Sequence, residues 1–326
     1  MKKYISLFLA ALMLLSLLAG CGKKSDGGDG TRTLVLRNTA GLSTNDPHAT
    51  TNTHDYTVFE NIYEGLYDLN EATGGYDLRL AEKVEANDDA TEYTVTLKQG
   101  VKFHNGETMT ADDVVFSYAH AQKDAHMGSY CRPLDHVEKV DDYTVKIVMN
   151  QPFSPIGHML HKVKIMSKKG VEELGNDFGK VPNKVGTGPY MWDENNYNPL
   201  SSWSAVAFED YHRGKAKIEK ITWNVIADDT SAITALQNGE LDYMVVPISY
   251  WEDIKASNKF NCVEKESNEV MLFCINVESK THGDLLRNDN IRLAMMYALD
   301  RDGINKLVCD GYGTPTYMLS LIHISE

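Results

Sequence analysis

The chain has 326 residues, of which 32 are basic and 46 acidic, giving a formal net charge of −14. Such an acidic body is not expected to bind nucleic acid or anionic lipid surfaces non-specifically. A hydrophobic content of 42% excludes an intrinsically disordered chain, and the length allows a large core and more than one domain.

The first residues have the pattern of a secretion signal. Lys2 and Lys3 precede an apolar stretch from Ile5 to Ala19, about fifteen residues long, whereas a membrane-spanning helix needs about twenty. The stretch ends in Leu18-Ala19-Gly20-Cys21, which resembles the bacterial lipobox. We therefore predict a lipoprotein signal peptide at residues 1–20 and lipidation of Cys21. The alternative is an ordinary signal peptide with an incidental cysteine.

Residues 21–33 are predicted to form a flexible tether, because they are rich in glycine and polar residues and have little to bury. Removal of Lys2 and Lys3 with the signal would take the net charge from −14 to −16. A lipid anchor followed by a tether holds a water-soluble body beside a membrane without embedding it. The predicted location is therefore extracytoplasmic, at the outer face of the cell membrane or in the periplasm.

The first elements of the body are a strand, a loop and a helix. Thr33 to Leu36 predicts a short strand, and an irregular loop from Asn38 to Pro47 follows it. A helix is expected from about Thr53 to Tyr63, because aromatic and aliphatic residues recur there at helical spacing.

Two later segments alternate apolar and polar residues with a period of two, as half-buried strands do. They are Tyr93 to Lys98 and Tyr143 to Met149, and each follows an acidic turn, so we predict two hairpins in one antiparallel sheet. Between them, Thr110 and Asp113 have the spacing of a capping box and predict the start of a helix.

The remaining segments alternate between strand and helix patterns. This mixture predicts a multi-lobed α/β protein. The expected strands are Ile221–Val225, Leu241–Val246, Phe260–Val263 and Val270–Ile275, and the expected helices are Thr230–Gln237, Asn290–Leu299 and Asp302–Val308.

The cysteines other than Cys21 do not have the spacing of a zinc site or a C-x-x-C motif; they are Cys131, Cys262, Cys274 and Cys309. Cys262 and Cys274 lie on two predicted neighbouring strands, so a cross-strand disulfide is one alternative outside the cytoplasm. Buried free thiols are the interpretation that we favour.

The sequence has no pattern typical of an enzyme. There is no G-x-S-x-G, no H-E-x-x-H and no phosphate-binding glycine loop, and adjacent acidic pairs such as Asp112-Asp113 are predicted to cap turns and helices. His158 and His161 have H-x-x-H spacing, yet no carboxylate lies nearby in the sequence, so a packed or solvated pair is favoured. We expect no catalytic residue, no metal and no cofactor.

Taken together, the segments resemble the extracytoplasmic solute-binding proteins of peptide/nickel-type ABC transporters, which include the oligopeptide- and dipeptide-binding proteins. The resemblance runs in family order from about Leu34 to Pro315. Its main stretches are Asn45–Pro47 with Glu60–Tyr67, Leu80–Glu82 with Tyr93–Ser117, Val185–Tyr190 with Ala235–Asp242, and Asn290–Arg301.

The resemblance implies an α/β, two-lobed periplasmic-binding-protein-like fold of type II with an extra α/β subdomain. The implied divisions are lobe I at 34–60 and 185–275, the additional subdomain at 61–184, and the start of lobe III at 276–326. Family members continue further, and Met318 to Glu326 does not resemble their continuation, so we expect an incomplete second lobe and a non-native tail.

The implied function is capture of peptides outside the membrane and delivery to an ABC permease, by a monomer that contacts the membrane only through its anchor and does not bind nucleic acid. The alternatives are a binder of a nickel chelate, an oligosaccharide or haem, and an extracytoplasmic envelope hydrolase. By family position, the expected ligand-binding residues are Asn38, Gly41, Leu42, Tyr130, Val245, Val246, Pro247, Phe273 and Asn276. For the apolar members of this set the competing interpretation is core packing, and for Asn38 and Gly41 it is turn geometry.

Overall fold

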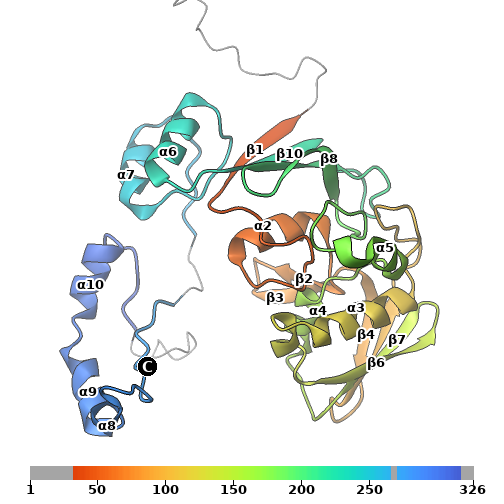
Figure 1. The fold of residues 1–326 in the computed structure, drawn as a ribbon, viewed down its shortest axis with the longest axis horizontal. Coiled ribbons are helices and arrows are strands. Elements are labelled where there is room, and N and C mark those ends of the chain that lie inside the picture. The colour runs from red at the N-terminus through yellow and green to blue at the C-terminus, as the bar shows by residue number, and fades with distance from the viewer. Residues whose placement is uncertain (1–31, 266–269, 317–326) are drawn as a thin grey trace, which may run out of the picture. The chain divides into compact units, whose positions relative to one another are not determined.

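The computed structural model describes residues 32–265 and 270–316 (Figure 1). The described chain divides into two compact units, one ending at Met244 and the other beginning at Val245. Cys21 and most of its tether, together with the tail from Met318, lie outside the described residues. No helix in the described part of the chain is long and apolar enough to cross a membrane.

The first unit contains a mixed four-stranded sheet with the order β1-β10-β9-β8. β1 pairs in parallel with β10, and β10, β9 and β8 pair in antiparallel fashion, so the first described strand is paired with a strand about 190 residues later. The strands are β1 (Thr33–Asn38), β8 (Tyr190–Asn198), β9 (Ser202–Ala207) and β10 (Lys220–Val225).

A hydrophobic cluster, here called the tryptophan cluster, covers this sheet. Trp192, Trp203 and Trp223 come from three of its strands, and Trp203 lies directly opposite Trp223. Helix α2 (Thr53–Ile62) packs Val58 and Phe59 into the same cluster. Large rings on adjacent strands bury much apolar area, which makes this cluster a main source of stability for the sheet.

A second sheet is entirely antiparallel and has the order β4-β5-β7-β6. The two predicted hairpins are confirmed: β4 pairs with β5, β6 pairs with β7, and β5 joins them by pairing with β7. Inward-facing residues alternate with exposed ones as the sequence predicts, and Tyr93 lies opposite Ile147. The strands are β4 (Ala81–Ala86), β5 (Glu92–Leu97), β6 (Leu134–Asp141) and β7 (Thr144–Met149).

Helix α3 (Ala111–Lys123) packs against β6 and β7 and buries Val114 and Tyr118 (Figure 1). Its predicted start is confirmed, because the Thr110 amide donates to the Asp113 carboxylate at 2.9 Å. The buried side chains here form a second hydrophobic cluster, spanning Leu66 to Ile165, which we call the hairpin cluster. The remaining elements of this region are β2 (Tyr67–Asn70), β3 (Gly75–Leu78), α4 (Ile156–Lys162) and α5 (Lys168–Leu174).

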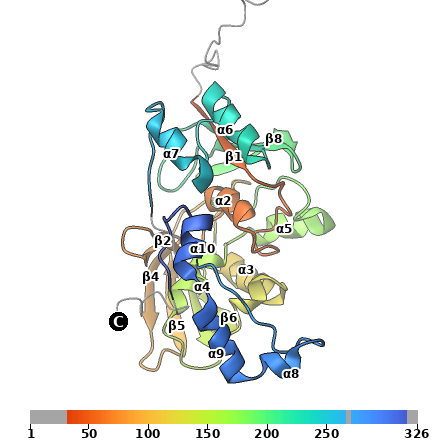
Figure 2. The ribbon, with the colours of Figure 1, turned by 90° about the vertical axis from the view of Figure 1, so that its left-hand side faces the viewer.

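The first unit ends with α6 (Asp229–Asn238), where Asp228 caps the Ser231 amide at 2.8 Å and Gly239 ends the helix with a positive φ of 77°. The second unit holds α7 (Ile248–Ala256), α8 (Gly283–Leu286), α9 (Asp289–Ala298) and α10 (Arg301–Val308). The last three follow one another closely along the chain (Figure 2). The predicted helices at residues 230–237, 290–299 and 302–308 are therefore confirmed.

Three predicted strands are wrong. Leu241–Val246 makes only one isolated bridge, between Tyr243 and Leu36, while Phe260–Val263 and Val270–Ile275 form no strand. A segment rich in residues that favour strands forms one only when another strand pairs with its backbone groups. Among the described residues, no strand pairs with these two segments. The predicted domain limits near residues 60, 184 and 275 stay predictions.

The four described cysteines are free thiols, so the structure does not support the cross-strand disulfide. Cys131 is buried, as the favoured alternative expects, and burial raises the pKa of its thiol to about 12. Cys274 is exposed, which corrects the prediction that these thiols are buried.

Candidate functional site

The loop that follows β1 is held in place by its backbone. Asn38 is buried, its carbonyl accepts from the Ile226 amide at 2.9 Å, and its side chain donates to the His54 carbonyl at 3.4 Å. A Cβ at Gly41 would lie 2.6 Å from the Pro199 carbonyl oxygen, so only glycine fits there. The structure thus brings Asn38, Gly41 and Leu42 together at one end of the strands of the first sheet. Leu42 is buried in the tryptophan cluster.

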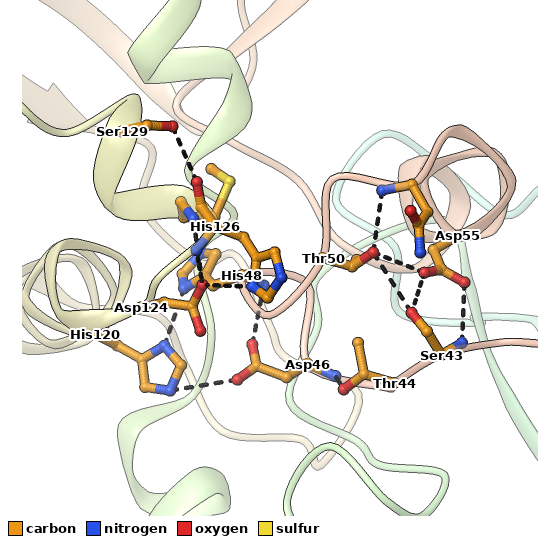
Figure 3. Close-up of polar contacts among 12 residues, drawn as sticks. Ser43, Thr44, Asp46, His48, Thr50, Asp55, His120, Asp124, His126 and Ser129 are labelled. Atoms are coloured by element: carbon orange, nitrogen blue, oxygen red, sulfur yellow. Dashed lines mark hydrogen bonds and ion pairs between the residues drawn. The ribbon is translucent and has the colours of Figure 1, made fainter. Parts of the chain in front are cut away.

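The next part of the loop is organised by Asp55, a fully buried carboxylate in the first turn of α2. It accepts from the Ser43 amide at 3.2 Å, from the Ser43 hydroxyl, and from the Thr50 hydroxyl at 2.7 Å (Figure 3). One carboxylate therefore ties both ends of residues 43–50 to the helix. Charge-assisted bonds of this kind hold a loop in a single conformation.

Within that loop, Asp46 and His48 face His120 on α3 (Figure 3). The Nδ1 atoms of His48 and His120 lie 3.1 Å apart, and His120 Nε2 lies 3.4 Å from Asp46 Oδ2. His48 is fully buried, and its Nε2 lies 3.0 Å from the Lys164 carbonyl oxygen. We call these three side chains the Asp-His-His cluster.

Burial sets the electrostatics of this cluster. It lowers the pKa of His48 to about 3, and the neighbouring His120 lowers it further, so the His48 ring is neutral at physiological pH. Burial also raises the pKa of Asp46, while His120 acts in the opposite direction. The cluster therefore combines a neutral imidazole with a buried carboxyl group. Both can accept a hydrogen bond or bind a cation.

Tyr130 ends a 3₁₀ turn (Met127–Ser129) and packs, half-buried, beside the hairpin cluster. Its ring centroid lies 5.4 Å from that of His158 on α4. Tyr130 therefore belongs to a different element from the Asn38–Leu42 loop.

The H-x-x-H pair is split between two environments, as the prediction of a packed or solvated pair allows. His158 Nδ1 lies 3.0 Å from the Tyr76 hydroxyl, whereas His161 is buried and faces Glu60 at 3.7 Å. Glu60, Asp68 and His161 form a second group of possible ligand atoms within 4.8 Å of one another. The carboxylates of this group come from parts of the chain about 100 residues before the histidine, which the local sequence did not reveal.

The other predicted ligand-binding residues lie in the second unit. Pro247 caps the start of α7, after Val245, which is 77% exposed, and Val246, which is half-buried. Phe273 is 68% exposed, and the Asn276 side chain accepts from the Glu278 amide at 3.0 Å. The exposure of Val245 and Phe273 shows that neither side chain is packed in a core.

Two surface depressions lie away from most of the predicted residues. One, of about 390 Å³, is lined in the second unit by residues of α7 and of the turn after α10, including Ile248, Glu252 and Tyr312. The other, of about 280 Å³, is lined in the first unit by residues around α5, including Asn105, Glu173 and Lys184. None of the predicted ligand-binding residues lines either depression.

The fold is shared with solved periplasmic solute-binding proteins. The oligopeptide-binding protein AppA from Bacillus subtilis, in complex with a nonapeptide, superposes with a TM-score of 0.74 at 25% identity over 91% of this chain and 60% of that one. DppA from Helicobacter pylori with the peptide STSA gives 0.74 at 25% identity over 87% of this chain and 59% of its own. NikZ from Campylobacter jejuni with Ni(L-His) gives 0.76 at 22% identity over 86% and 56%, a likeness of fold alone. The predicted α/β fold class of type II is confirmed.

The sequence profile described as "Bacterial extracellular solute-binding proteins, family 5 Middle" matches residues 76–324. The chain therefore belongs to this family of solute-binding proteins, as the resemblance in its sequence implied. The glutathione-binding protein GsiB of Salmonella paratyphi A is 30% identical over 94% of this chain and 59% of its own length. That of Escherichia coli K12 is 31% identical over 84% and 53%. The chain thus spans less than two thirds of the length of these relatives.

Proposed function

We propose that the chain captures short peptides outside the membrane and delivers them to the permease of an ABC importer. The observation that carries this proposal is the 30% identity to glutathione-binding proteins over 94% of the chain. Glutathione is itself a tripeptide-like molecule, and two solved structures of the same fold hold peptides. Peptide backbones supply the same donors and acceptors whatever their side chains, so one binding site can accept many sequences.

The Asn38–Leu42 loop is suited to this task because its shape does not depend on a ligand. Its position is fixed by the Leu42 amide, which donates to the Pro199 carbonyl at 2.8 Å, and by the close approach at Gly41. A preorganised loop loses little conformational entropy when it binds. We propose that Asn38 and Gly41, as part of this loop, contact the peptide through backbone groups. In the second unit, we propose Phe273 separately as an apolar contact, because its ring is 68% exposed.

Thermal unfolding of the chain carrying Cys21→Ala, with and without glutathione and a series of di- to hexapeptides, tests the ligand class. A ligand at 100 times its Kd stabilises the folded state by about 2.7 kcal/mol, which raises the Tm measurably. Ni(L-His) and oligosaccharides serve as comparison ligands. If these raise the Tm while no peptide does, the peptide proposal is wrong.

Phe273→Ala should lower the affinity for the best peptide with little effect on the Tm of the free protein, because the ring is 68% exposed. The matched control is Tyr297→Ala, which removes an aromatic ring that is 82% exposed in the same unit. Isothermal titration calorimetry compares the two variants. Equal affinities in both would remove Phe273 from the proposed site.

We also propose that Cys21 is acylated and anchors the protein at the outer face of the membrane. The support is the apolar stretch that ends in Leu18-Ala19-Gly20-Cys21. Mass spectrometry of the amino-terminal peptide should find a diacylglyceryl modification on Cys21, and Cys21→Ala should release the protein from the membrane fraction. Wild-type protein with an unmodified Cys21 would refute the anchor.

A further inference from the structure

The Asp-His-His cluster is the group of side chains that the proposed function leaves unexplained. We propose that Asp46, His48 and His120 form a binding site for one divalent transition-metal ion, such as Zn²⁺ or Ni²⁺. Each residue offers one ligand atom, and these atoms lie within 4.8 Å of one another. Two imidazoles and one carboxylate form a ligand set that suits these ions.

The hydrogen bond of His48 determines which of its nitrogen atoms is available. Nε2 lies 3.0 Å from the Lys164 carbonyl oxygen, which can only accept, so Nε2 carries the proton. Nδ1 therefore presents its lone pair to the interior of the cluster. Metal-binding histidines are typically oriented in this way, with the second ring nitrogen donating to a carbonyl or a carboxylate.

Donor and acceptor counting shows that the cluster offers more acceptors than donors. His48 Nδ1 is an acceptor, and so is the Asp46 carboxylate, yet His120 lies between them, 3.1 Å from one and 3.4 Å from the other. A neutral His120 ring has one N–H and can satisfy only one of these two acceptors. A bound divalent cation would accept a lone pair from each of the three side chains and so satisfy both acceptors at once.

The spacing of the atoms also fits a metal ion. Two nitrogen ligands at about 2.0–2.1 Å from a tetrahedral ion lie about 3.4 Å from each other. The two Nδ1 atoms are 3.1 Å apart, so the rings would have to turn for both lone pairs to meet at one ion. Asp46 Oδ2, which faces His120 Nε2 at 3.4 Å, would have to move towards the same point. The three residues leave one tetrahedral position for water or for a donor atom of a ligand.

The carboxylate is held in position by its neighbours. Asp46 Oδ1 accepts from the His48 amide at 2.9 Å, and the Asp46 amide donates to the Thr44 hydroxyl at 3.0 Å. These bonds leave Oδ2 directed at His120, as Figure 3 shows. Asp124 adds negative charge close to both Asp46 and His48. Such supporting bonds reduce the entropy that the ligands lose when they bind an ion.

The second group of possible ligands, Glu60, Asp68 and His161, is less suited to a cation. The Lys164 ammonium, which is buried, lies 2.8 Å from the Glu60 carboxylate and already neutralises its charge. A metal ion there would have to displace this pair or bind beside a positive charge. The same lysine thus blocks one group through its side chain and orients the other through its carbonyl.

Calorimetric titration of the chelator-treated Cys21→Ala chain with ZnCl₂ and with NiCl₂ tests the proposal, and atomic emission of the dialysed product gives the stoichiometry. We expect one ion per chain and a loss of affinity of at least tenfold in His120→Gln and in His48→Gln. Cobalt substitution should give the visible absorption of a tetrahedral or five-coordinate site in the parent chain and not in His120→Gln. No peptide is needed for these measurements, so their outcome is independent of the proposed function.

The matched control is His136→Gln, which removes an exposed histidine that lies 2.7 Å from the Asp135 carboxylate on β6. It should bind metal as the parent does. Near-ultraviolet circular dichroism establishes that each variant is folded before titration. Undiminished binding in His120→Gln would assign the ion to other groups, such as the free thiols, and would overturn the proposal, as would the absence of stoichiometric binding in the parent chain.

Discussion

Replacement of Glu64 should destabilise the first unit more than replacement of an exposed carboxylate does. Glu64 is 4% exposed and lies in sequence between Tyr63 of the tryptophan cluster and Leu66 of the hairpin cluster. Its carboxylate accepts from the Tyr211 hydroxyl at 2.8 Å and from the Thr187 hydroxyl at 3.0 Å. One buried side chain thus joins segments that are about 120 to 150 residues apart in the sequence.

Two cationic or ionisable groups complete the surroundings of Glu64. His212 Nε2 lies 3.0 Å from Oε2, and Arg79 Nε lies 3.4 Å from Oε1. Burial, with Glu64 as the next cause, raises the pKa of Tyr211, so its hydroxyl stays a donor at all physiological pH values. Removal of the carboxylate would leave the buried Thr187 hydroxyl and the partly buried Tyr211 and His212 without this acceptor, while Arg79 would keep its pair with Asp68.

The expected magnitude follows from that count. Removal of one partner from a buried ion pair costs about 3–5 kcal/mol, because the remaining groups pay their desolvation without compensation. Glu64→Ala should therefore lower the free energy of unfolding by about this amount. Glu64→Gln keeps the shape and some of the hydrogen bonds and should cost less. The control is Glu173→Ala, an exposed residue whose pair with Lys169 at 3.7 Å should contribute less than about 1 kcal/mol.

Urea unfolding followed by tryptophan fluorescence is the appropriate assay. Trp192, Trp203 and Trp223 are all buried in the tryptophan cluster, so their emission reports on the part of the first unit that Glu64 anchors. The reasoning would be refuted if Glu64→Ala and Glu173→Ala unfolded at the same urea concentration with the same slope.

Two further predictions concern the segment that packs on Tyr63. Gly186→Ala would place a Cβ 2.3 Å from the Ile62 carbonyl oxygen and should cost about 1–3 kcal/mol or more, whereas Gly75→Ala, which meets only a threonine hydroxyl at 3.3 Å, should cost less than about 1 kcal/mol in the same urea assay. Burial lowers the pKa of His104 to about 4, so the unfolded chain, with an ordinary value near 6.5, binds a proton first as the pH falls. The contribution of neutral His104 to the free energy of unfolding is therefore fully present above pH 6.5 and is lost as the pH falls towards 4. At pH 5 the loss is about 2 kcal/mol. His104→Gln, whose amide can still donate to the Gly188 carbonyl, should remove that part of the difference between pH 7.5 and pH 5, and an unchanged difference would contradict the assignment.

The elements that could be predicted are those whose pattern is local. The alternation in 93–98 and 143–149 predicts β5 and β7 because one face of each strand is buried in the hairpin cluster. The Thr110-Asp113 pair predicts α3 because a helix start is satisfied within four residues. The segments 260–263 and 270–275 have similar composition, yet a strand also needs a partner, and composition does not report whether one is present.

Glu64 shows the same limit for polar residues. The sequence places it after the helix of residues 53–63, where it has the pattern of an exposed acidic residue that ends a helix. Its burial depends on Thr187 and Tyr211, whose approach is set by the order of strands in the first sheet. A carboxylate at such a position becomes visible as a core residue only when its distant donors are known.

The Asp-His-His cluster combines both kinds of information. Asp46 and His48 flank Pro47, and the short bond from the His48 amide to Asp46 is a local turn that a sequence can suggest. The third member, His120, is 72 residues away and reaches the turn only because α3 packs beside it. H-x-x-H spacing drew attention to His158 and His161 instead, although the helix directs the first towards Tyr76 and the second towards Glu60. Sequence spacing identifies ligand sets that lie within one element. A set shared between a loop and a helix is defined by a tertiary contact instead. Here that contact is the hydrogen bond between the Nδ1 atoms of His48 and His120, and the Lys164 carbonyl orients the His48 ring that takes part in it.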